Sequence, residues 1–270
     1  MSFRPNAIMH KDHPTTRLFR FPRRIARAAT VALGVAAWPV SALAYRPFDG
    51  TDAAVADPGE FEIEFQPAGV QHEPGQTSLV APATVLNFGF AKDWEAVLQG
   101  RAETPLSPSG AGSFSDAGLF LKHVLRDGSL QEQSGPSIAT EFGVLLPGIN
   151  ADAGIGVSVA GIVSQRWEWT TVHFNVQAAL TRDQHADTFV GTIIEGPSKW
   201  AVRPVAEIFY EDEFGVAQTI SGLVGAIWQV NDKLSFDVGL RHAFTNGRPV
   251  NEVRAGLTVG FPTGLFANRK

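Results

Sequence analysis

The segment from Val253 to Phe261 alternates between two kinds of residue without a break. Its odd positions are apolar, and its even positions are small, polar or charged, which is the two-residue period of a β-strand with two unlike faces. In a soluble sandwich the apolar face would pack into a core. In an outer-membrane barrel it would face lipid, and the polar face would line the lumen. The pattern therefore restricts the chain to one of two all-β architectures.

The same segment favours the membrane alternative. Its order of residue types, a polar residue followed by glycine, an apolar residue and a final aromatic residue, resembles the C-terminal assembly signal of bacterial outer-membrane barrels. The positions that carry this resemblance are Arg254, Gly256, Val259 and Phe261.

Alternation recurs along the whole chain after residue 60, and turn signals such as Asp127-Gly128 and Asn246-Gly247 separate the alternating segments. Their spacing suits membrane-spanning strands of about 9–11 residues with modest connections. We expect an antiparallel up-and-down transmembrane β-barrel of about twelve strands, at about 60–67, 79–91, 94–104, 115–126, 136–147, 154–164, 169–182, 187–195, 199–211, 216–230, 233–245 and 250–261.

The N-terminal region has the order of a secretory signal peptide. An arginine-rich stretch ending at Arg27 precedes the apolar run from Ala28 to Trp38 and the cleavage motif Ala42-Leu43-Ala44. We therefore expect residues 1–44 to be removed and the barrel domain to span residues 45–270. Translation from Met9 and a twin-arginine signal at Arg23-Arg24 are alternatives, although no cofactor motif follows.

Removal of the signal changes the charge of the chain. Seven of the 22 Lys and Arg residues but only one of the 27 Asp and Glu residues lie in residues 1–44, so the mature chain carries a net charge of about −11. Such a charge argues against nucleic acid or anionic lipid as an electrostatic partner. The chain has no cysteine, so its stability in an oxidising compartment must come from backbone pairing and packing.

Connection lengths suggest a topology with both chain ends in the periplasm. The tight turns Lys92-Asp93 and Asn231-Asp232 then lie on the periplasmic side, and the connections 105–114 and 147–153 on the outer side, although 127–135 is long for a periplasmic turn. The acidic run Glu211-Asp212-Glu213 is expected on the outer side as a solvated loop. The alternative is a bridge to lipopolysaccharide through divalent cations.

A family resemblance covers nearly all of the mature chain. The segments Gly59-Glu60-Phe61-Glu62-Ile63-Glu64, Phe90-Ala91-Lys92-Asp93-Trp94-Glu95, Val230-Asn231-Asp232-Lys233-Leu234 and Arg254-Ala255-Gly256-Leu257 resemble the outer-membrane β-barrel family named for the MetA pathway of phenol degradation. The resemblance implies a transporter-like barrel for small, including aromatic, compounds. The chain departs from many barrels because Pro262 to Lys270 follow the terminal aromatic residue.

Polar and charged residues at inward strand positions are the candidates for lining the lumen. Charges are tolerated there only if they are hydrated or paired, because burial in the bilayer would cost several kcal/mol each. They either surround a water-filled path or form a salt-bridged network that closes a narrow barrel. The candidates are Arg101, Glu103, Glu141, His173, Asn175, Gln177, Arg203, Glu207, Asp237, Arg241, Glu252 and Arg254.

The sequence supports no metal site, cofactor or enzymatic activity. None of His123, His173, His185 and His242 has a second histidine or a glutamate at ligand spacing. Ser164 and His185 could form part of a hydrolase site, but neither a nucleophile motif nor a neighbouring acid accompanies them. The aromatic residues near predicted strand ends suit girdles at the membrane interfaces: Trp94, Trp167, Trp169, Trp200, Tyr210 and Trp228.

We therefore predict an exported outer-membrane barrel of a Gram-negative bacterium that forms a channel for small solutes, aromatic or hydrophobic ones included. Its expected partners are outer-membrane lipid, lipopolysaccharide and the barrel-assembly machinery. Two alternatives stay open: an occluded structural barrel without transport, and a secreted soluble β-sandwich that binds a ligand.

Overall fold

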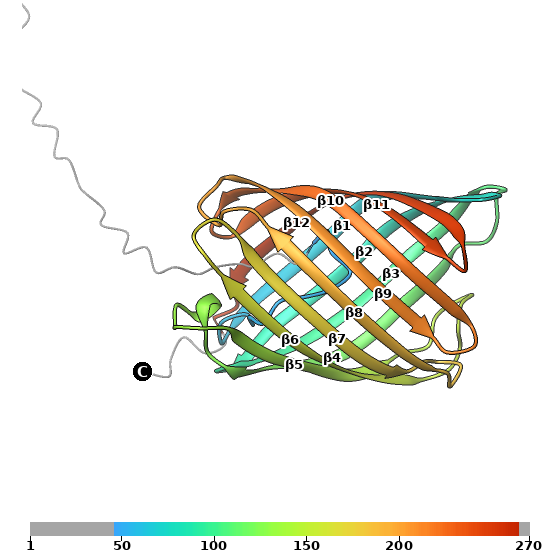
Figure 1. Ribbon diagram of the computed structural model, residues 1–270. Helices are drawn as coiled ribbons and strands as arrows, with labels where there is room; N and C mark the ends of the chain where they lie inside the picture. The colour runs from blue at the N-terminus through green and yellow to red at the C-terminus, as the bar shows by residue number, and fades with distance from the viewer. Residues whose placement is uncertain (1–45, 265–270) are drawn as a thin grey trace, which may run out of the picture. The chain divides into compact units, whose positions relative to one another are not determined.

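In the computed structural model, which describes residues 46–264, twelve antiparallel strands form one closed barrel (Figure 1). Each strand pairs with its sequence neighbours, and the first pairs with the last, with Phe61 opposite Phe261. A single 3-10 turn, η1 (Ser129–Gln131), interrupts the series. The strands are β1 (Glu60–Glu73), β2 (Gln76–Ala91), β3 (Trp94–Ser107), β4 (Ser113–Arg126), β5 (Ser137–Leu145), β6 (Gly156–Arg166), β7 (Thr171–Leu180), β8 (Ala186–Glu195), β9 (Val202–Glu213), β10 (Ala217–Asn231), β11 (Leu234–Thr245) and β12 (Arg248–Pro262).

The predicted barrel and its strand number are confirmed; most strand bounds differ from the prediction by up to three residues, and two differences change the description of the chain. β1 extends to Glu73, because the tight turn Pro74-Gly75, whose glycine has a φ of 92°, lets Val70 to Glu73 pair with Gln76 to Leu79 of β2. The run Glu211-Asp212-Glu213 was expected to be a solvated loop, and this is wrong. It is the end of β9, because β8 and β10 both pair with it. The expected signal peptide, residues 1–44, lies outside the described residues.

The two faces of the wall follow the sequence alternation. On β7, Phe174 is 44% exposed on the outside, whereas its neighbour Asn175 faces the lumen and is buried. Similar apolar side chains cover the outside on the other strands, among them Leu119, Val159, Val190, Ile208, Val224, Leu240 and Val253. No helix in the range 46–264 has the length and hydropathy needed to cross a membrane.

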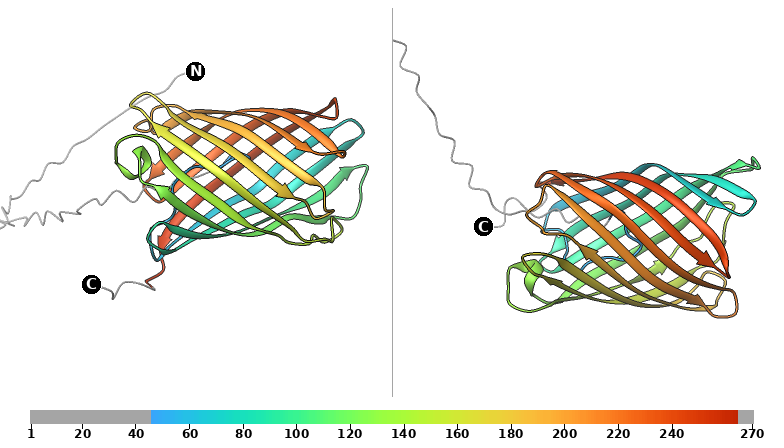
Figure 2. Two further views of the ribbon diagram at one scale, coloured as in Figure 1. Left: turned by 60° about the horizontal axis from the view of Figure 1, so that its bottom comes forward. Right: turned by 45° about the horizontal axis from the view of Figure 1, so that its top comes forward.

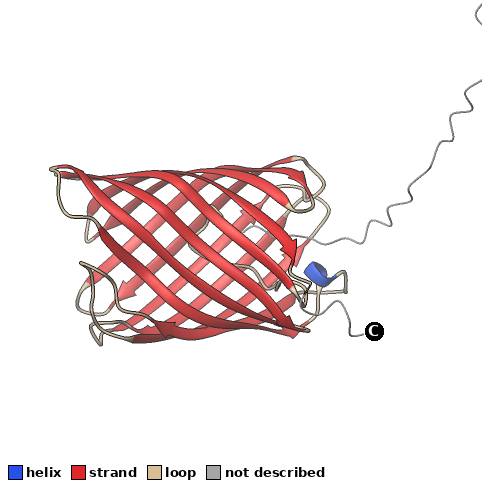
Figure 3. Cartoon of the chain, turned by 180° about the vertical axis from the view of Figure 1, so that it is seen from behind, coloured by secondary structure: helices blue, strands red, loops and turns tan. Residues whose placement is uncertain are grey.

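The barrel has two distinct ends (Figure 2). We call the end where β1 begins and β12 finishes the terminal end, and the other the distal end. The turns 92–93 and 232–233 lie at the terminal end, and each end has one long connection, 127–136 at the terminal end and 146–155 at the distal end. Figure 3 shows η1 within the long terminal connection. Connection length therefore does not distinguish the two ends.

Aromatic side chains do distinguish them. Every tryptophan in the described range lies at the terminal end, in the turns or in the last strand residues, whereas Tyr210 lies near the distal end. Most of these tryptophans are well exposed, as expected for rings that sit at a membrane interface. The tryptophans are Trp94, Trp167, Trp169, Trp200 and Trp228.

Residues 46–59, which precede β1, run inside the barrel (Figure 1, blue), and we call them the plug. Within the plug Asp52 and Ala53 are completely buried. Ala53 belongs to a small apolar cluster with Leu130, Ala139 and Ile162 on the inner wall. This placement divides the lumen into a plugged terminal half and an open distal half.

Candidate functional site

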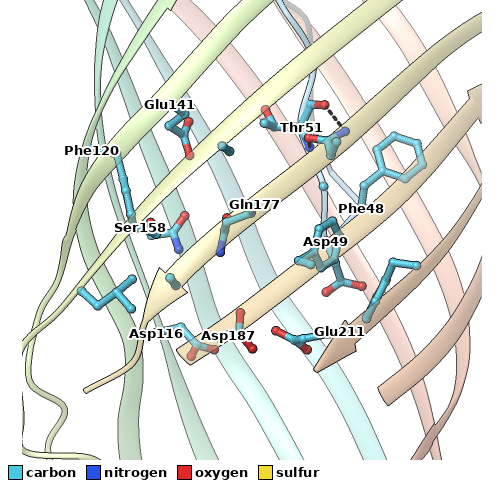
Figure 4. Close-up of a pocket in the computed structure, with 18 of the residues that line it drawn as sticks. Phe48, Asp49, Thr51, Asp116, Phe120, Glu141, Ser158, Gln177, Asp187 and Glu211 are labelled. Atoms are coloured by element: carbon cyan, nitrogen blue, oxygen red, sulfur yellow. Dashed lines mark hydrogen bonds between the residues drawn. The ribbon is translucent and has the colours of Figure 1, made fainter. Parts of the chain in front are cut away.

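The lumen contains a cavity of about 620 Å³ that extends from the distal half to Lys122 beside the plug, and we call it the distal cavity. Its floor is the tip of the plug, including Phe48, Asp49 and Thr51, and its walls are inward side chains from most of the strands (Figure 4). Amide, hydroxyl and charged groups dominate the lining. The site is therefore a polar cavity whose inner boundary is formed by the chain's own N-terminal segment.

Wall side chains hold the plug through its backbone. The carboxylate of Glu207 accepts from two successive amides, at 2.9 Å from Asp49 N and 2.7 Å from Gly50 N. Asn175 accepts from Thr51 N at 3.1 Å and donates to Thr51 O at 2.9 Å. Because the plug has no strand partner here, these side chains satisfy backbone groups that would otherwise be buried without hydrogen bonds.

The tip of the plug is also held by charge. Arg254 donates to Pro47 O at 2.8 Å and lies 3.1 Å from Asp49 Oδ1, and Arg241 lies 3.5 Å from Asp49 Oδ2. Glu252 lies 2.8 Å from Arg254, so the two arginines and two carboxylates form one network across β11, β12 and the plug. Such a network keeps buried guanidinium groups compensated.

Two further ion pairs join the plug to the wall. Lys122 Nζ lies 3.2 Å from Asp52 Oδ1, and both side chains are almost completely buried. Burial raises the pKa of Asp52 above its usual value, and the charge of Lys122 opposes this rise. On the other side of the lumen Arg46 lies 3.4 Å from Asp237. The plug thus supplies a partner to both an acidic and a basic residue of the wall.

Glycines in the wall allow this close approach. A Cβ at Gly89 would collide with the carbonyl oxygens of Ala56 and Asp57, and one at Gly256 would collide with the Arg46 guanidinium and lie 2.8 Å from Phe65 O. Backbone carbonyls cannot move aside as a flexible side chain can, so both positions favour glycine, and Gly89, which meets two carbonyls, is the more restrictive.

A buried polar chain lies beside the plug. Ser164 Oγ accepts from Ala53 N at 3.0 Å and lies 2.8 Å from His173 Nδ1, and His173 Nε2 lies 3.2 Å from Glu195 Oε1. Arg203 completes the chain at 3.2 Å from Glu195. Although the order resembles a Ser-His-Glu relay, Ser164 is fully buried and its oxygen is engaged with the plug, so no substrate carbonyl reaches it.

The pairing of Ser164 with His185 considered from the sequence is wrong. Ser164 lies toward the terminal end of β6, whereas His185 lies in the β7–β8 connection at the distal end. The direction in which each strand runs separates the two residues by nearly the full height of the barrel.

The structure distributes the predicted lumen residues between the two halves. Glu103 is half-buried at the distal end, outside the cavity lining. The residues that line the cavity are Arg101, Glu141, Asn175, Gln177 and Arg241. The residues that hold the plug, directly or through a neighbour, are His173, Asn175, Arg203, Glu207, Asp237, Arg241, Glu252 and Arg254.

The proposed assembly-signal residues occupy both faces of β12. Arg254 and Gly256 face the lumen beside the plug, and Phe261 faces outward, with its ring 5.7 Å from that of Phe61. Val259 pairs with Ile63 of β1 and Leu234 of β11.

Sequence reasoning missed three sets of site residues. The plug acids Asp49 and Asp52 lie in a segment without alternation, so no strand pattern drew attention to them. Lys122 lies on β4, where the alternation is broken. The distal carboxylates Asp187, Glu211 and Glu213 line the cavity. The sequence could have indicated Glu211 and Glu213, because the two-residue period of β9 continues through the acidic run.

Nothing in the described range suggests a metal centre, since no three His, Asp or Glu side chains there are grouped to hold an ion. The cavity chemistry consists of hydrogen bonding, charge and aromatic faces.

Comparison with solved structures shows what the barrel is similar to. The COG4313 outer membrane channel from Pseudomonas putida F1 matches with a TM-score of 0.56 at 10% identity, covering 79% of this chain and 100% of that one. The KdgM porin in complex with disordered oligogalacturonate matches with a TM-score of 0.51 at 11% identity, covering 74% and 99%. No family model and no curated protein sequence matches the chain. At these identities the likeness concerns the fold, so the chain has the closed barrel fold of outer-membrane channels and porins.

Proposed function

We propose that this protein is an outer-membrane channel for small solutes, in which the plug controls passage through the lumen. The observation that carries the proposal is the polar distal cavity, whose floor is a segment outside the barrel wall. A segment held mainly by side-chain contacts can be displaced without breaking the strand ladder. The similar channel and porin structures support the fold that this function needs.

The family named for the MetA pathway suggests a narrower range of solutes. We propose that small aromatic compounds are among them, because four phenylalanines line the otherwise polar cavity: Phe48, Phe120, Phe189 and Phe209. Aromatic faces beside amide and carboxylate groups suit solutes with both an apolar body and a polar group.

The arrangement in the cell is part of the same proposal. We place the terminal end in the periplasm, where a cleaved signal peptide would leave the plug, and the distal end at the cell surface beside lipopolysaccharide. The apolar outer face then meets lipid, and the β12 pattern ending at Phe261 engages the barrel-assembly machinery.

Planar-bilayer recording tests the channel function. We expect purified wild-type protein to pass a small ionic current. Deletion of residues 46–56 removes most of the plug from the lumen and should raise this current several-fold. The deletion keeps Asp57 to Gly59 and their hydrogen bonds to the start of the barrel, so the barrel should still close. Truncation of residues 265–270 is the matched control and should leave the current unchanged. Background current from both the wild type and the plug deletion would reject the channel.

A structural barrel without transport is the second candidate, and the buried ion pairs of the plug favour it. If the plug never leaves, its amides should stay protected from hydrogen exchange as long as those of the strands. Exchange at plug amides that is much faster than exchange in β7 would exclude a permanently occluded barrel.

A further inference from the structure

We propose that the distal cavity contains a subsite for an organic cation, a protonated amine attached to an aromatic or alkyl body. The subsite consists of the carboxylates of Asp187, Glu211 and Glu213 together with the rings of Phe189 and Phe209, all on the inner face of β8 and β9. The inference rests on the proposed function and narrows the class of solute that the channel takes.

The strand register brings the carboxylates together. Asp187 lies directly opposite Glu213, and Glu211 lies opposite Phe189, so the side chains alternate inward on adjacent strands. Residues opposite each other in an antiparallel pair have Cβ atoms about 4.5–5.5 Å apart, where like charges destabilise the pairing. Figure 4 shows Asp187 and Glu211 pointing into the same cavity as Asp49 and Gln177.

No hydrogen bond or ion pair within residues 46–264 compensates these carboxylates. Asp187 is only 7% exposed, yet no group of that range donates a hydrogen bond to its carboxylate and no cation lies within ion-pair distance of it. The side chains of Glu211 and Glu213 are half-buried and also have no donor in that range, although the charge of Arg241 acts on Glu211 from a longer distance. A low-exposure carboxylate without a donor is costly unless water or a ligand compensates it.

Basic side chains of the cavity do not fill this role, because each has another partner. Arg101 pairs with Asp116 at 2.8 Å, and Arg182 donates to two backbone carbonyls. The other three basic residues of the lining are paired with plug or wall carboxylates: Arg46, Lys122 and Arg241. The eight acidic residues of the lining therefore outnumber its five basic residues, all of which have partners.

Aromatic rings adjoin the carboxylates. Phe189 and Phe209 have ring centroids 4.9 Å apart, and both residues line the cavity. The guanidinium carbon of Arg241 lies 5.4 Å from the centroid of Phe209, so one ring of this pair already carries a cation of the protein, and the Phe189 ring carries none among the described residues. An ammonium held between the carboxylates and the face of the Phe189 ring would gain both charge pairing and a cation–π contact.

A metal ion fits the same carboxylates less well. Among the described residues no three ligand side chains are grouped closely enough to hold one. Asp187 and Glu213 form one cross-strand pair, and Glu211 lies two residues away along β9. This spacing suits an organic cation, whose charge is distributed over an ammonium group and its neighbouring CH₂.

Titration calorimetry on the full-length protein in detergent tests the subsite. We expect 2-phenylethylammonium to bind about tenfold more tightly than neutral 2-phenylethanol, and 3-phenylpropionate to bind more weakly than either. The variant D187N/E211Q/E213Q should weaken the ammonium about tenfold and leave the alcohol unchanged. Phe189→Leu should weaken the ammonium by about two- to fivefold.

The matched control removes the same charge elsewhere at the distal end. The variant E73Q/E103Q/D183N neutralises three acids that do not line the cavity, and it should bind the ammonium as the wild type does. Equal affinity for the ammonium and the alcohol would overturn the subsite, as would equal losses in the two triple variants. Calcium that displaces the ammonium at stoichiometric concentration would overturn it in favour of a metal site.

Failure of the subsite and failure of the channel give different results. Calorimetry does not depend on conduction, so ammonium binding by a protein that carries no current would reject the channel and keep the subsite. Current through the plug-deleted barrel without selective ammonium binding would reject the subsite alone.

Discussion

The two halves of the lumen are built from the same strands but differ in whether their inward charged side chains have partners. In the terminal half, Lys122, Asp237 and Arg254 each meet a plug residue of opposite charge or a backbone carbonyl. In the distal half the arginines are paired, whereas Asp187 and Glu211 have no donor in the described chain. Inward charges that the plug reaches are therefore structural, whereas carboxylates such as Asp187 that neither the plug nor a wall cation reaches face the cavity.

Energetic consequences follow from this difference. Removing one member of a buried pair leaves an uncompensated charge and costs about 3–5 kcal/mol. Removing a carboxylate that faces a hydrated cavity should cost little and can relieve repulsion. Substitutions of similar size in the two halves should thus differ by several kcal/mol.

The largest effect should come from Lys122→Met. The change leaves Asp52 buried without its partner, so we expect the plug to dock about 3–5 kcal/mol less favourably. Hydrogen exchange of the plug amides measures this, because undocking exposes them. The double variant K122M/D52N should restore part of the protection. Unchanged exchange in K122M would show that the pair does not hold the plug.

Two arginine substitutions on the inward face of β7 compare the plugged half of the lumen with the open half. Asn175→Arg removes both hydrogen bonds to Thr51 and adds bulk beneath the plug, so we expect a loss of about 1–3 kcal/mol in docking. Gln177→Arg, two residues further along the same face, extends into the cavity and should change stability by less than about 0.5 kcal/mol. Urea unfolding together with plug exchange distinguishes them. Equal losses would remove the contrast between the halves.

The smallest effect should follow Asp187→Asn. The amide has nearly the shape of the carboxylate and removes repulsion toward Glu213, so unfolding in urea should change by no more than about 0.5 kcal/mol, in the stabilising direction. A loss above 1 kcal/mol would mean that Asp187 serves the fold and is not available to a ligand.

The strand pattern was largely predictable, for a local reason. The side-chain period of a strand is two, so the outward position of Phe174 and the inward position of Asn175 follow from the sequence once one face is apolar. The same argument correctly anticipated the turn at Lys92-Asp93. The prediction was wrong at Glu211 to Glu213, because three successive acidic residues indicated a solvated loop. In the structure these residues extend β9, because β8 and β10 both pair with them.

The partners of the lumen charges were not predictable. The sequence predicted that the inward charges either line water or pair with each other; in the structure several pair with Asp49 and Asp52 of the plug, and others face the cavity. The contact between Ser164 and His173 likewise depends on which strands are adjacent and on the position of Ala53.

The sequence by itself thus determined about twelve two-faced strands and which residues share each face, because alternation is a local property read along each strand; closure into a barrel with the polar face inward is seen in the structure. Only the tertiary structure decided where residues 46–59 lie and which charges they neutralise. The reason is physical: the plug makes no periodic contacts, and its position depends on side chains from eight strands that meet only when the barrel closes. That same closure leaves Asp187, Glu211 and Glu213 facing an open cavity.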